Sequence, residues 1–193
     1  MEPINIQKRD LAEKPKRMRR NGIIPAVIFG SFLTESIPVQ MEEATARMIV
    51  RTKREGSRLN LKLDGELIPV QVKEKVVNTL NNDIVHLTFQ ALKKDEKINS
   101  VIHIVLKNRD KVTETLETMR MVIPYSALPG DMIDTVTVDL DGMPVGTLLK
   151  VEDIPELLND KIELQCDLDE IVLRISDHRN IAAPEEAAAT EEV

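Results

Sequence analysis

The chain has 193 residues, of which 42% are hydrophobic and 31% are charged, and its formal net charge is -7. This balance is ordinary for a globular protein and is sufficient for the core of one large or two small domains. No apolar run approaches the roughly 18 residues of a membrane-spanning helix, the N-terminus lacks a signal-peptide pattern, and the single cysteine excludes an internal disulfide. We therefore expect a cytoplasmic protein without membrane contact.

Charge is unevenly distributed along the chain. Residues 1–90 carry 15 Lys and Arg against 11 Asp and Glu, whereas residues 91–193 carry 11 against 22. The two parts therefore have net charges of +4 and -11. A positive surface collects phosphates, and a negative one repels nucleic acid and adds solubility. We expect the two parts to face different partners.

The positive charge is concentrated in the segment KPKRMRR, residues 14–20, which places five cations directly before the apolar stretch NGIIPAVIFG. A run of Lys and Arg is often only solvated surface. The same residue types also bind phosphate groups and position nucleic acids. Both interpretations remain open from the segment alone.

Beyond this segment the dominant period is two. Alternation of apolar and polar residues predicts strands at residues 23–29, 36–40, 58–63, 66–73 and 84–89. Residues 41–53 break this period, because Met41, Ala44, Met48 and, at the margin, Ile49 fall on one helical face. We predict a short helix there.

Two features of the following strands are more specific. Asp64-Gly65 separates two alternating runs and predicts a hairpin, since a two-residue type I′ turn needs positive φ at both positions. In DIVHLTF, alternation places His86 and Thr88 on one face and Val85, Leu87 and Phe89 on the other. The polar face is either an exposed sheet surface or a platform for a ligand.

The polar segment 93–100 has no apolar period, and we expect a domain boundary there. Short alternating runs resume beyond it and predict a second set of strands at residues 101–106, 120–124, 134–140, 161–165 and 170–176.

The chain ends in a stretch dominated by Ala and Glu, which offers too little apolar surface to offset the entropy of ordering it. We therefore predict an N-terminal domain at residues 1–92, a C-terminal β-rich domain at 93–178 and an acidic disordered tail at 179–193.

Residues that would indicate catalysis are scarce. The seven glycines form neither a phosphate-binding loop nor a dinucleotide fingerprint. His86, His103 and His178 are far apart in the sequence, and alternation places His103 opposite Ile102 and Ile104 without a role. No nucleophile, base and orienting group can be assembled. We predict no catalytic residue, metal, cofactor or small-molecule substrate.

Residues 16–30, KRMRRNGIIPAVIFG, resemble the bacterial large-subunit ribosomal protein L twenty-five, also called general stress protein Ctc. In that family a basic cluster is followed by a glycine and by Pro-Ala-Val-Ile-Tyr-Gly. The similarity continues in DIVHLTF, where the family commonly has His-Val-Asp-Phe, in LPGDMIDTVTVDLDGMPVGTLLKVEDIP, and in the Ala/Glu tail.

The resemblance implies a fold class that is mainly β with a few short helices: an N-terminal β-barrel that binds 5S ribosomal RNA, and a C-terminal β-rich domain. It implies a ribosome-associated protein of the large subunit, with ribosomal protein neighbours as possible partners of the C-terminal domain.

It also implies roles for particular residues. A basic loop between the first strand and the strand at 23–29 would grip phosphates through Lys14, Lys16, Arg17, Arg19 and Arg20, with Arg9 in support. A sheet face would lie on the shallow minor groove of A-form RNA, and its members would be Phe29, Lys73, His86 and Thr88.

The chain departs from the family pattern at two of these positions. Phe29 stands where the family has Tyr, and Thr88 where it has Asp, which removes a hydroxyl and a carboxylate acceptor. These departures, with the negative charge beyond residue 90, leave a second interpretation open. The protein would then be a diverged general-stress paralogue that acts through protein contacts and binds RNA weakly or without specificity.

Overall fold

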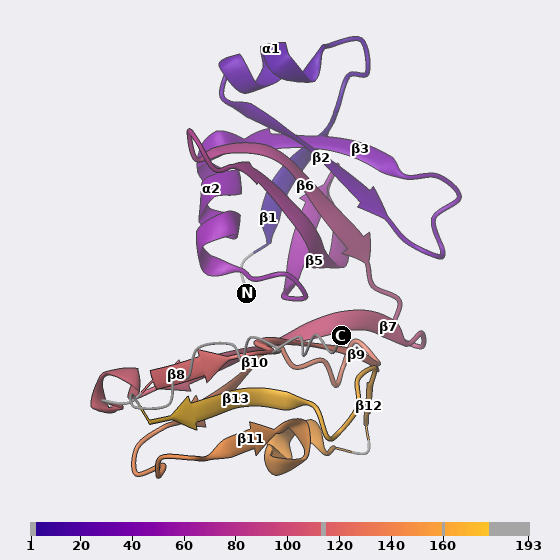
Figure 1. The fold of residues 1–193 in the computed structure, drawn as a ribbon. Coiled ribbons are helices and arrows are strands. Elements are labelled where there is room, and N and C mark those ends of the chain that lie inside the picture. The colour runs from indigo at the N-terminus through magenta and orange to yellow at the C-terminus, as the bar shows by residue number, and fades with distance from the viewer. Residues whose placement is uncertain (1–2, 113–114, 160, 178–193) are drawn as a thin grey trace, which may run out of the picture.

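The structure, a computed structural model, describes residues 3–112, 115–159 and 161–177. The chain is mainly β, with a closed barrel at one end and two further sheets at the other (Figure 1). This confirms the predicted fold class. The predicted tail at 179–193 lies outside the described residues.

Six strands close the barrel in the order β1-β3-β2-β6-β5-β4. Their bounds are β1 Ile4–Lys8, β2 Ile23–Phe29, β3 Ile37–Glu42, β4 Arg58–Leu63, β5 Glu66–Asn78 and β6 Asp83–Ala91. The five strands expected in this part of the chain are all present. Alternation along β2 and β6 turns Ile24, Ala26 and Ile28, with Leu87 and Phe89, into the barrel core.

The hairpin between β4 and β5 is the predicted one. Leu63 pairs with Glu66 across the turn, and Asp64 and Gly65 have φ values of 50° and 95°. Both central residues therefore adopt the positive φ that a tight hairpin turn requires.

Helix α2, Glu43–Thr52, forms where a helix was expected, but of the predicted helical face only the marginal member Ile49 is a buried helix residue. Ala46 and Ile49 are buried in the barrel core, whereas Ala44 is exposed and Met48 is 46% exposed. The reason is that Met41 belongs to β3 and not to the helix. Its burial follows the strand period, so it gives no guide to the helical face.

The basic segment forms helix α1, Pro15–Arg20, where the resemblance implied a loop. Pro15 stands at the first helical turn, where its missing N–H costs nothing. Three of the basic residues lie in the last turn, where they complement the helix dipole: Arg17, Arg19 and Arg20. Met18 is 0% exposed and anchors this short helix to the barrel.

The rest of the described chain forms two sheets, with strand orders β10-β7-β9-β12 and β11-β13-β8. Their bounds are β7 Ile98–Lys107, β8 Thr115–Thr118, β9 Val122–Ala127, β10 Thr135–Asp139, β11 Leu148–Lys150, β12 Ile162–Leu164 and β13 Ile171–Ser176. Three short 3-10 helices connect them, η1 Arg109–Lys111, η2 Val151–Asp153 and η3 Pro155–Leu157. All five predicted strands are present, and β8 and β11 are additional. The two sheets enclose a second apolar core that includes Ile102, Ile123, Tyr125 and Leu173.

The loop between α2 and β4 packs closely against β7. Gly56 has a φ of +83°, and a Cβ on it would lie 2.7 Å from Ser100 Oγ and 2.8 Å from the carbonyl oxygen of Val101. Glycine is therefore needed both for the backbone conformation and for the close approach.

Polar contacts cross the same junction. Gln71 Nε2 and Lys73 Nζ each donate to the carbonyl oxygen of Asn99, at 3.2 Å. His103 Nε2 lies 3.0 Å from the carbonyl oxygen of Glu55. His103, to which the sequence assigned no role, therefore contacts the barrel.

Candidate nucleic-acid interface

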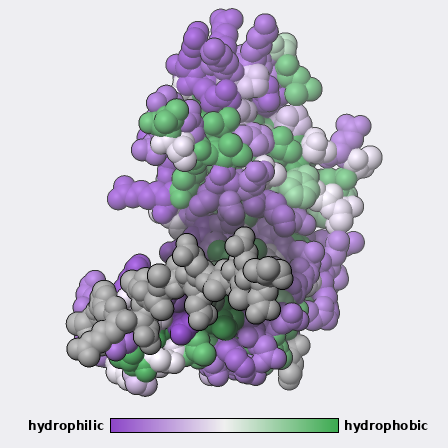
Figure 2. All heavy atoms as spheres, viewed as in Figure 1, coloured by the Kyte–Doolittle hydropathy of each residue, from purple (hydrophilic) through white to green (hydrophobic). Residues whose placement is uncertain are grey.

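Helix α1 lies at the end of the barrel that faces away from the two sheets formed by β7 to β13 (Figure 1). Its C-terminal carbonyls are closed by Asn21, whose backbone N–H donates to the carbonyl oxygens of Arg17 and Met18, and by Gly22, whose N–H donates to that of Arg19. With Met18 buried beneath it, the helix turns its cations outward. Figure 2 shows a largely hydrophilic surface at this end of the molecule.

Four of the five cations of residues 14–20 differ in whether they have an acidic partner. Arg17 lies 3.9 Å from Glu13, and Arg9 Nη2 donates to the Glu13 carbonyl oxygen at 3.2 Å. Lys14, Lys16 and Arg20 are exposed and form no ion pair with any residue that the structure describes. Arg9 thus braces the segment from the end of β1, while the exposed cations remain available to an anion.

Arg19 joins α1 to strand β6. Its Nη1 donates to the carbonyl oxygen of Val85 at 3.3 Å. The β5–β6 register shifts at this point, so that Val85 has no partner on β5 while Ile84 and His86 do. Such a bulge leaves one residue outside the ladder, and its carbonyl is then accessible to a side chain.

The bulge also corrects the predicted faces of β6. Val85 was expected in the core with Leu87 and Phe89, but Ile84 takes that place, and Val85 is half-buried outside the core cluster. From His86 onward the prediction is confirmed, because Leu87 and Phe89 are buried and the side chains between them face outward.

His86 lies on this outer face, half-buried. Burial lowers the pKa of its imidazole, and the positive charges of Arg9 and Arg19 act in the same direction. A hydrogen bond to Pro25 and the charge of Glu74 oppose these effects. Proline has no N–H, so the imidazole is the donor to the Pro25 carbonyl. The second ring nitrogen of the neutral side chain is then an acceptor.

Thr88 and Phe29 belong to the same outer face. Thr88 pairs with Val27 on β2 and with Glu74 on β5, while Phe29 pairs with Gln90. Paired residues of neighbouring strands point to the same side of a sheet. The structure therefore brings Phe29, His86 and Thr88 together on one surface, beside Arg9 and Arg19.

Lys73 does not join them. The β5–β6 register shifts at this residue as well, so it has no partner on β6, and its ammonium is bonded to Asn99 at the junction with β7. Of the residues predicted from the sequence, it is the one that points toward the other part of the molecule.

The sequence analysis did not single out Gln7 and Gln40 as residues of this outer face. They pair with one another across β1 and β3, and Gln40 also pairs with Pro25 on β2, which extends the outer face toward α1. Their signal in the sequence is weak but present, because each is a polar residue among apolar ones in INIQK and IPVQM.

Two negative findings concern the described residues. Within the ranges 3–112, 115–159 and 161–177, no group of three or more His, Cys, Asp or Glu side chains is arranged to hold a metal ion. No helix in that part of the chain has the length and apolar content needed to cross a membrane.

Comparison with known proteins divides the chain in the same order as its sheets. Residues 4–89 match the model of the Ribosomal L25p family. Residues 97–179 match the model of the C-terminal domain of ribosomal protein TL5. The first match covers the barrel with α1 and α2, and the second covers the two remaining sheets.

Similar curated proteins extend over nearly the whole chain, and those described here are each called large ribosomal subunit protein bL25. The one from Listeria monocytogenes serotype 4b (strain F2365) is 25% identical, over 97% of this chain and 90% of its own length. The protein of Thermoanaerobacter sp. (strain X514) is 25% identical over 91% and 89%, and that of Finegoldia magna (strain ATCC 29328 / DSM 20472 / WAL 2508) is 27% identical over 86% and 84%. The chain belongs to the ribosomal L25p family, in the long form that carries a TL5-type C-terminal domain.

Proposed function

We propose that this chain is a structural constituent of the large ribosomal subunit and binds 5S ribosomal RNA through α1 and the adjoining outer face of β2 and β6. The observation that carries the proposal is the hydrogen bond from Arg19 to Val85. It holds a surface of exposed cations beside a sheet face that carries His86 and Thr88.

The cations of α1 suit the phosphates of an RNA duplex, and the sheet face suits its minor groove. Lys14, Lys16, Arg17 and Arg20 supply positive charge for phosphates, which fixes the position of the protein without reading sequence. The sheet face is broad, and the minor groove of A-form RNA is wide and shallow. The face therefore reaches ribose hydroxyls and base edges there.

His86 and Thr88 supply the polar contacts in that groove. With its N–H donated to Pro25, the neutral imidazole of His86 offers an acceptor to a ribose 2′-hydroxyl. The Thr88 hydroxyl both donates and accepts. Phe29, half-buried two residues along β2 from Val27, offers a ring edge for packing against a sugar or base.

The second part of the chain has a different role in this proposal. Its negative charge disfavours contact with RNA, so we assign it to ribosomal protein neighbours. We also propose that residues 1–92 and 93–178 are the two domains, with the junction at Gly56 and Asn99 holding them together.

A filter-binding titration of the full chain with 5S ribosomal RNA tests the proposal, with transfer RNA as competitor and the salt concentration varied. We expect binding that resists the competitor. The triple substitution Lys16→Ala, Arg17→Ala and Arg20→Ala should weaken binding at least about tenfold and reduce the salt slope by about one for each phosphate that is no longer bound.

A matched control removes three cations from the other part of the chain: Lys107→Ala, Arg109→Ala and Lys111→Ala. It should leave affinity and slope unchanged. Equal competition by transfer RNA, or an unchanged slope in the α1 variant, would contradict the proposal and favour a paralogue that acts through protein contacts.

The sheet face is tested separately by Thr88→Val, which removes the hydroxyl and keeps the shape of the side chain. Removal of one specific hydrogen bond should weaken binding several-fold, since such interactions are worth about 1–3 kcal/mol. The salt slope should not change, because the substitution removes no positive charge from the RNA-binding surface. An unaltered affinity would remove Thr88 from the interface.

A further inference from the structure

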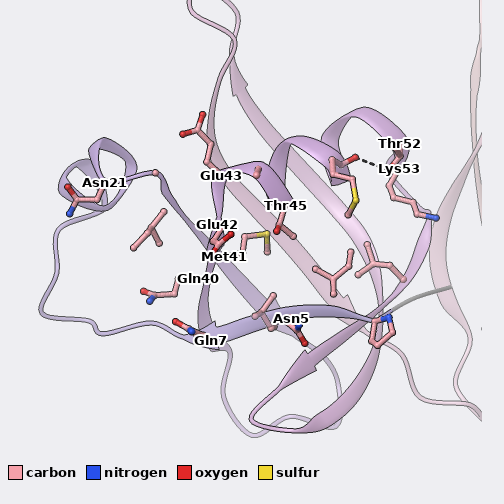
Figure 3. Close-up of a pocket in the computed structure, with 18 residues that line it drawn as sticks. Asn5, Gln7, Asn21, Gln40, Met41, Glu42, Glu43, Thr45, Thr52 and Lys53 are labelled. Atoms are coloured by element: carbon pink, nitrogen blue, oxygen red, sulfur yellow. Dashed lines mark hydrogen bonds between the residues drawn. The ribbon is translucent and has the colours of Figure 1, made fainter.

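A pocket of about 1060 Å³ opens beside α1, between β1, β3 and α2 (Figure 3). It forms because β1 changes partner along its length. Ile4 to Ile6 pair with β4, whereas Gln7 and Lys8 pair with β3. The two strands β1 and β3 therefore separate on the N-terminal side of Gln7, past Gln40 of β3, and α2 crosses the opening.

The pocket has an apolar wall and a polar wall. Its apolar lining comprises Ile4, Ile6, Met41, Met48 and Leu59, and its polar lining includes the four carboxamides of Asn5, Gln7, Asn21 and Gln40 together with the carboxylates of Glu42 and Glu43. Figure 3 shows Asn21, Gln40 and Gln7 on the side of α1, with Thr45 and Thr52 of α2 across from them.

The four carboxamides are not used within the protein. Among the described residues, none of their side-chain groups forms a hydrogen bond with another residue, while Thr52, on the opposite side, donates to the carbonyl oxygen of Met48 at 2.7 Å. A carboxamide carries adjacent donor and acceptor groups. Four of them lining one pocket match a ligand with the same alternation of donors and acceptors.

Met48 makes the apolar wall accessible. It is 46% exposed, although it lies on the helical face that the sequence pattern assigns to the core. Methionine side chains are flexible and polarizable, and they pack favourably against aromatic rings. Ile6, Met41 and Leu59 are almost fully buried in the barrel core, so Met48 is the apolar side chain that packs on a flat ring, while the polar groups bond to the edge of that ring.

The neighbourhood of the pocket favours one kind of ligand. Asn21 directly follows Arg19 and Arg20 in α1, so the rim of the pocket is continuous with the cationic surface. That surface attracts a polyanion, whereas the pocket itself carries the carboxylates of Glu42 and Glu43, of which Glu43 is paired with Arg47. A carboxylate accepts a hydrogen bond from the amino group of a base and repels a phosphate, so the pocket suits the base and not the backbone of the strand. Nucleobases carry adjacent donors and acceptors on their edges and apolar faces, and unstacked bases are the usual target of specific RNA recognition.

We propose that this pocket receives an unstacked base of the RNA strand that α1 holds. The inference rests on the proposed function, since the RNA must first be bound at α1. The volume of the pocket, about 1060 Å³, is just above the usual range of sites for small ligands, about 300–1,000 Å³. Its open mouth leaves the sugar and phosphate outside. The carboxamides of Gln7, Gln40 and Asn21 bond to the edge of the base.

Methyl NMR of methionine tests this in the full chain. Met41 and Met48 line the pocket, Met18 lies under α1, and Met119 and Met143 lie in the second part of the chain. On addition of 5S ribosomal RNA, ring currents from a seated base should shift Met41 and Met48, with Met119 and Met143 unchanged.

Each other outcome has a definite meaning. A shift of Met18 without Met41 and Met48 would mean that RNA binds α1 and leaves the pocket empty, which overturns this inference but keeps the proposed function. If 5S RNA shifts none of them, the proposed function fails. The same NMR spectra are then recorded with AMP, GMP, CMP and UMP at millimolar concentration. A shift of Met48 would support a pocket for a base, and the absence of a shift would overturn it.

Substitution of the polar wall separates a bound base from a rearranged helix. Gln7→Ala with Gln40→Ala should weaken 5S RNA binding about tenfold, leave the salt slope unchanged and abolish the shift of Met48. Asn60→Ala is the control, since Asn60 is an exposed carboxamide on β4 that does not line this pocket. Equal effects of the two substitutions would overturn the inference.

Discussion

Arg19 Nη1 lies 3.3 Å from the carbonyl oxygen of Val85, which follows 66 residues later in the chain. The hydrogen bond connects the basic helix to the strand that carries His86. It forms at a bulge, where the carbonyl of Val85 is outside the β5–β6 ladder. The position of α1 on the barrel therefore depends on an irregularity of β6.

This relationship predicts different costs for two neighbouring arginines. Arg19→Ala should lower the free energy of unfolding by about 1 kcal/mol, because it removes a hydrogen bond from a charged donor. Arg20→Ala, at an exposed residue without such a partner among the described residues, should change it by less than about 0.5 kcal/mol. Urea denaturation of the two variants checks this, and equal losses of stability would show that the Arg19 hydrogen bond does not hold α1.

Substitutions of Met18 and Met48 give a second comparison, between a buried and an exposed methionine. Met18→Ala should destabilise the protein by about 2–5 kcal/mol, because it opens a cavity beneath α1 at a side chain that is 0% exposed. Met48→Ala should cost less than about 1 kcal/mol, since Met48 is on the surface and alanine favours the helix. Thermal and urea unfolding measure both. A similar loss of stability in the two variants would contradict the assigned burial.

His86 predicts a pH dependence of stability. Its pKa is lowered in the folded protein, chiefly by burial, while in the unfolded chain it stays near 6.5. Below that pH the unfolded chain binds a proton that the folded protein resists, so the free energy of unfolding falls as the pH falls. Above it both states are neutral and the effect vanishes.

The variant His86→Gln isolates this contribution from the titration of carboxyl groups. The difference in the free energy of unfolding between wild type and variant should be constant from pH 8 to about 7 and should decrease as the pH falls toward about 5. NMR titration of the imidazole measures its pKa directly. A difference that grows on acidification would mean that His86 is stabilised in its protonated form.

Gly56 and Gly142 test the junction between the barrel and β7. Both have positive φ, but a Cβ on Gly142 would meet nothing within 4 Å. Gly142→Ala should therefore cost only the backbone strain, about 1–2 kcal/mol. Gly56→Ala should cost roughly 1–3 kcal/mol more, because its Cβ would collide with Ser100 and Val101.

Unfolding followed by two probes shows where the loss of stability occurs. With Gly56→Ala, the barrel and the second pair of sheets should unfold in separate transitions, since the substitution weakens the packing between them. A single transition with the same cost as Gly142→Ala would mean that the close approach at Gly56 does not couple the two parts.

Part of the candidate site was predictable because it depends on local sequence. Outward positions of His86 and Thr88 follow from the strand period, and the positive charge of α1 is read directly from the sequence. The pairing of Gln7 with Gln40 was not predictable, because it depends on a strand partner that is distant in sequence. Lys73 was assigned to the wrong neighbourhood for the same reason, since a register shift redirects it toward Asn99.

Local sequence was enough to place most of the strands, the Asp64-Gly65 turn and the basic segment, because alternation and turn chemistry act between residues that are close along the chain. It was not enough to show which face of α2 is buried, that Met18 anchors a helix, or that β1 pairs with β3 only from Gln7 onward. These features depend on how the barrel closes, and closure is set by packing and register between distant segments. The adjacency of Arg19 to Val85, and of the carboxamide pocket to α1, follows from that closure.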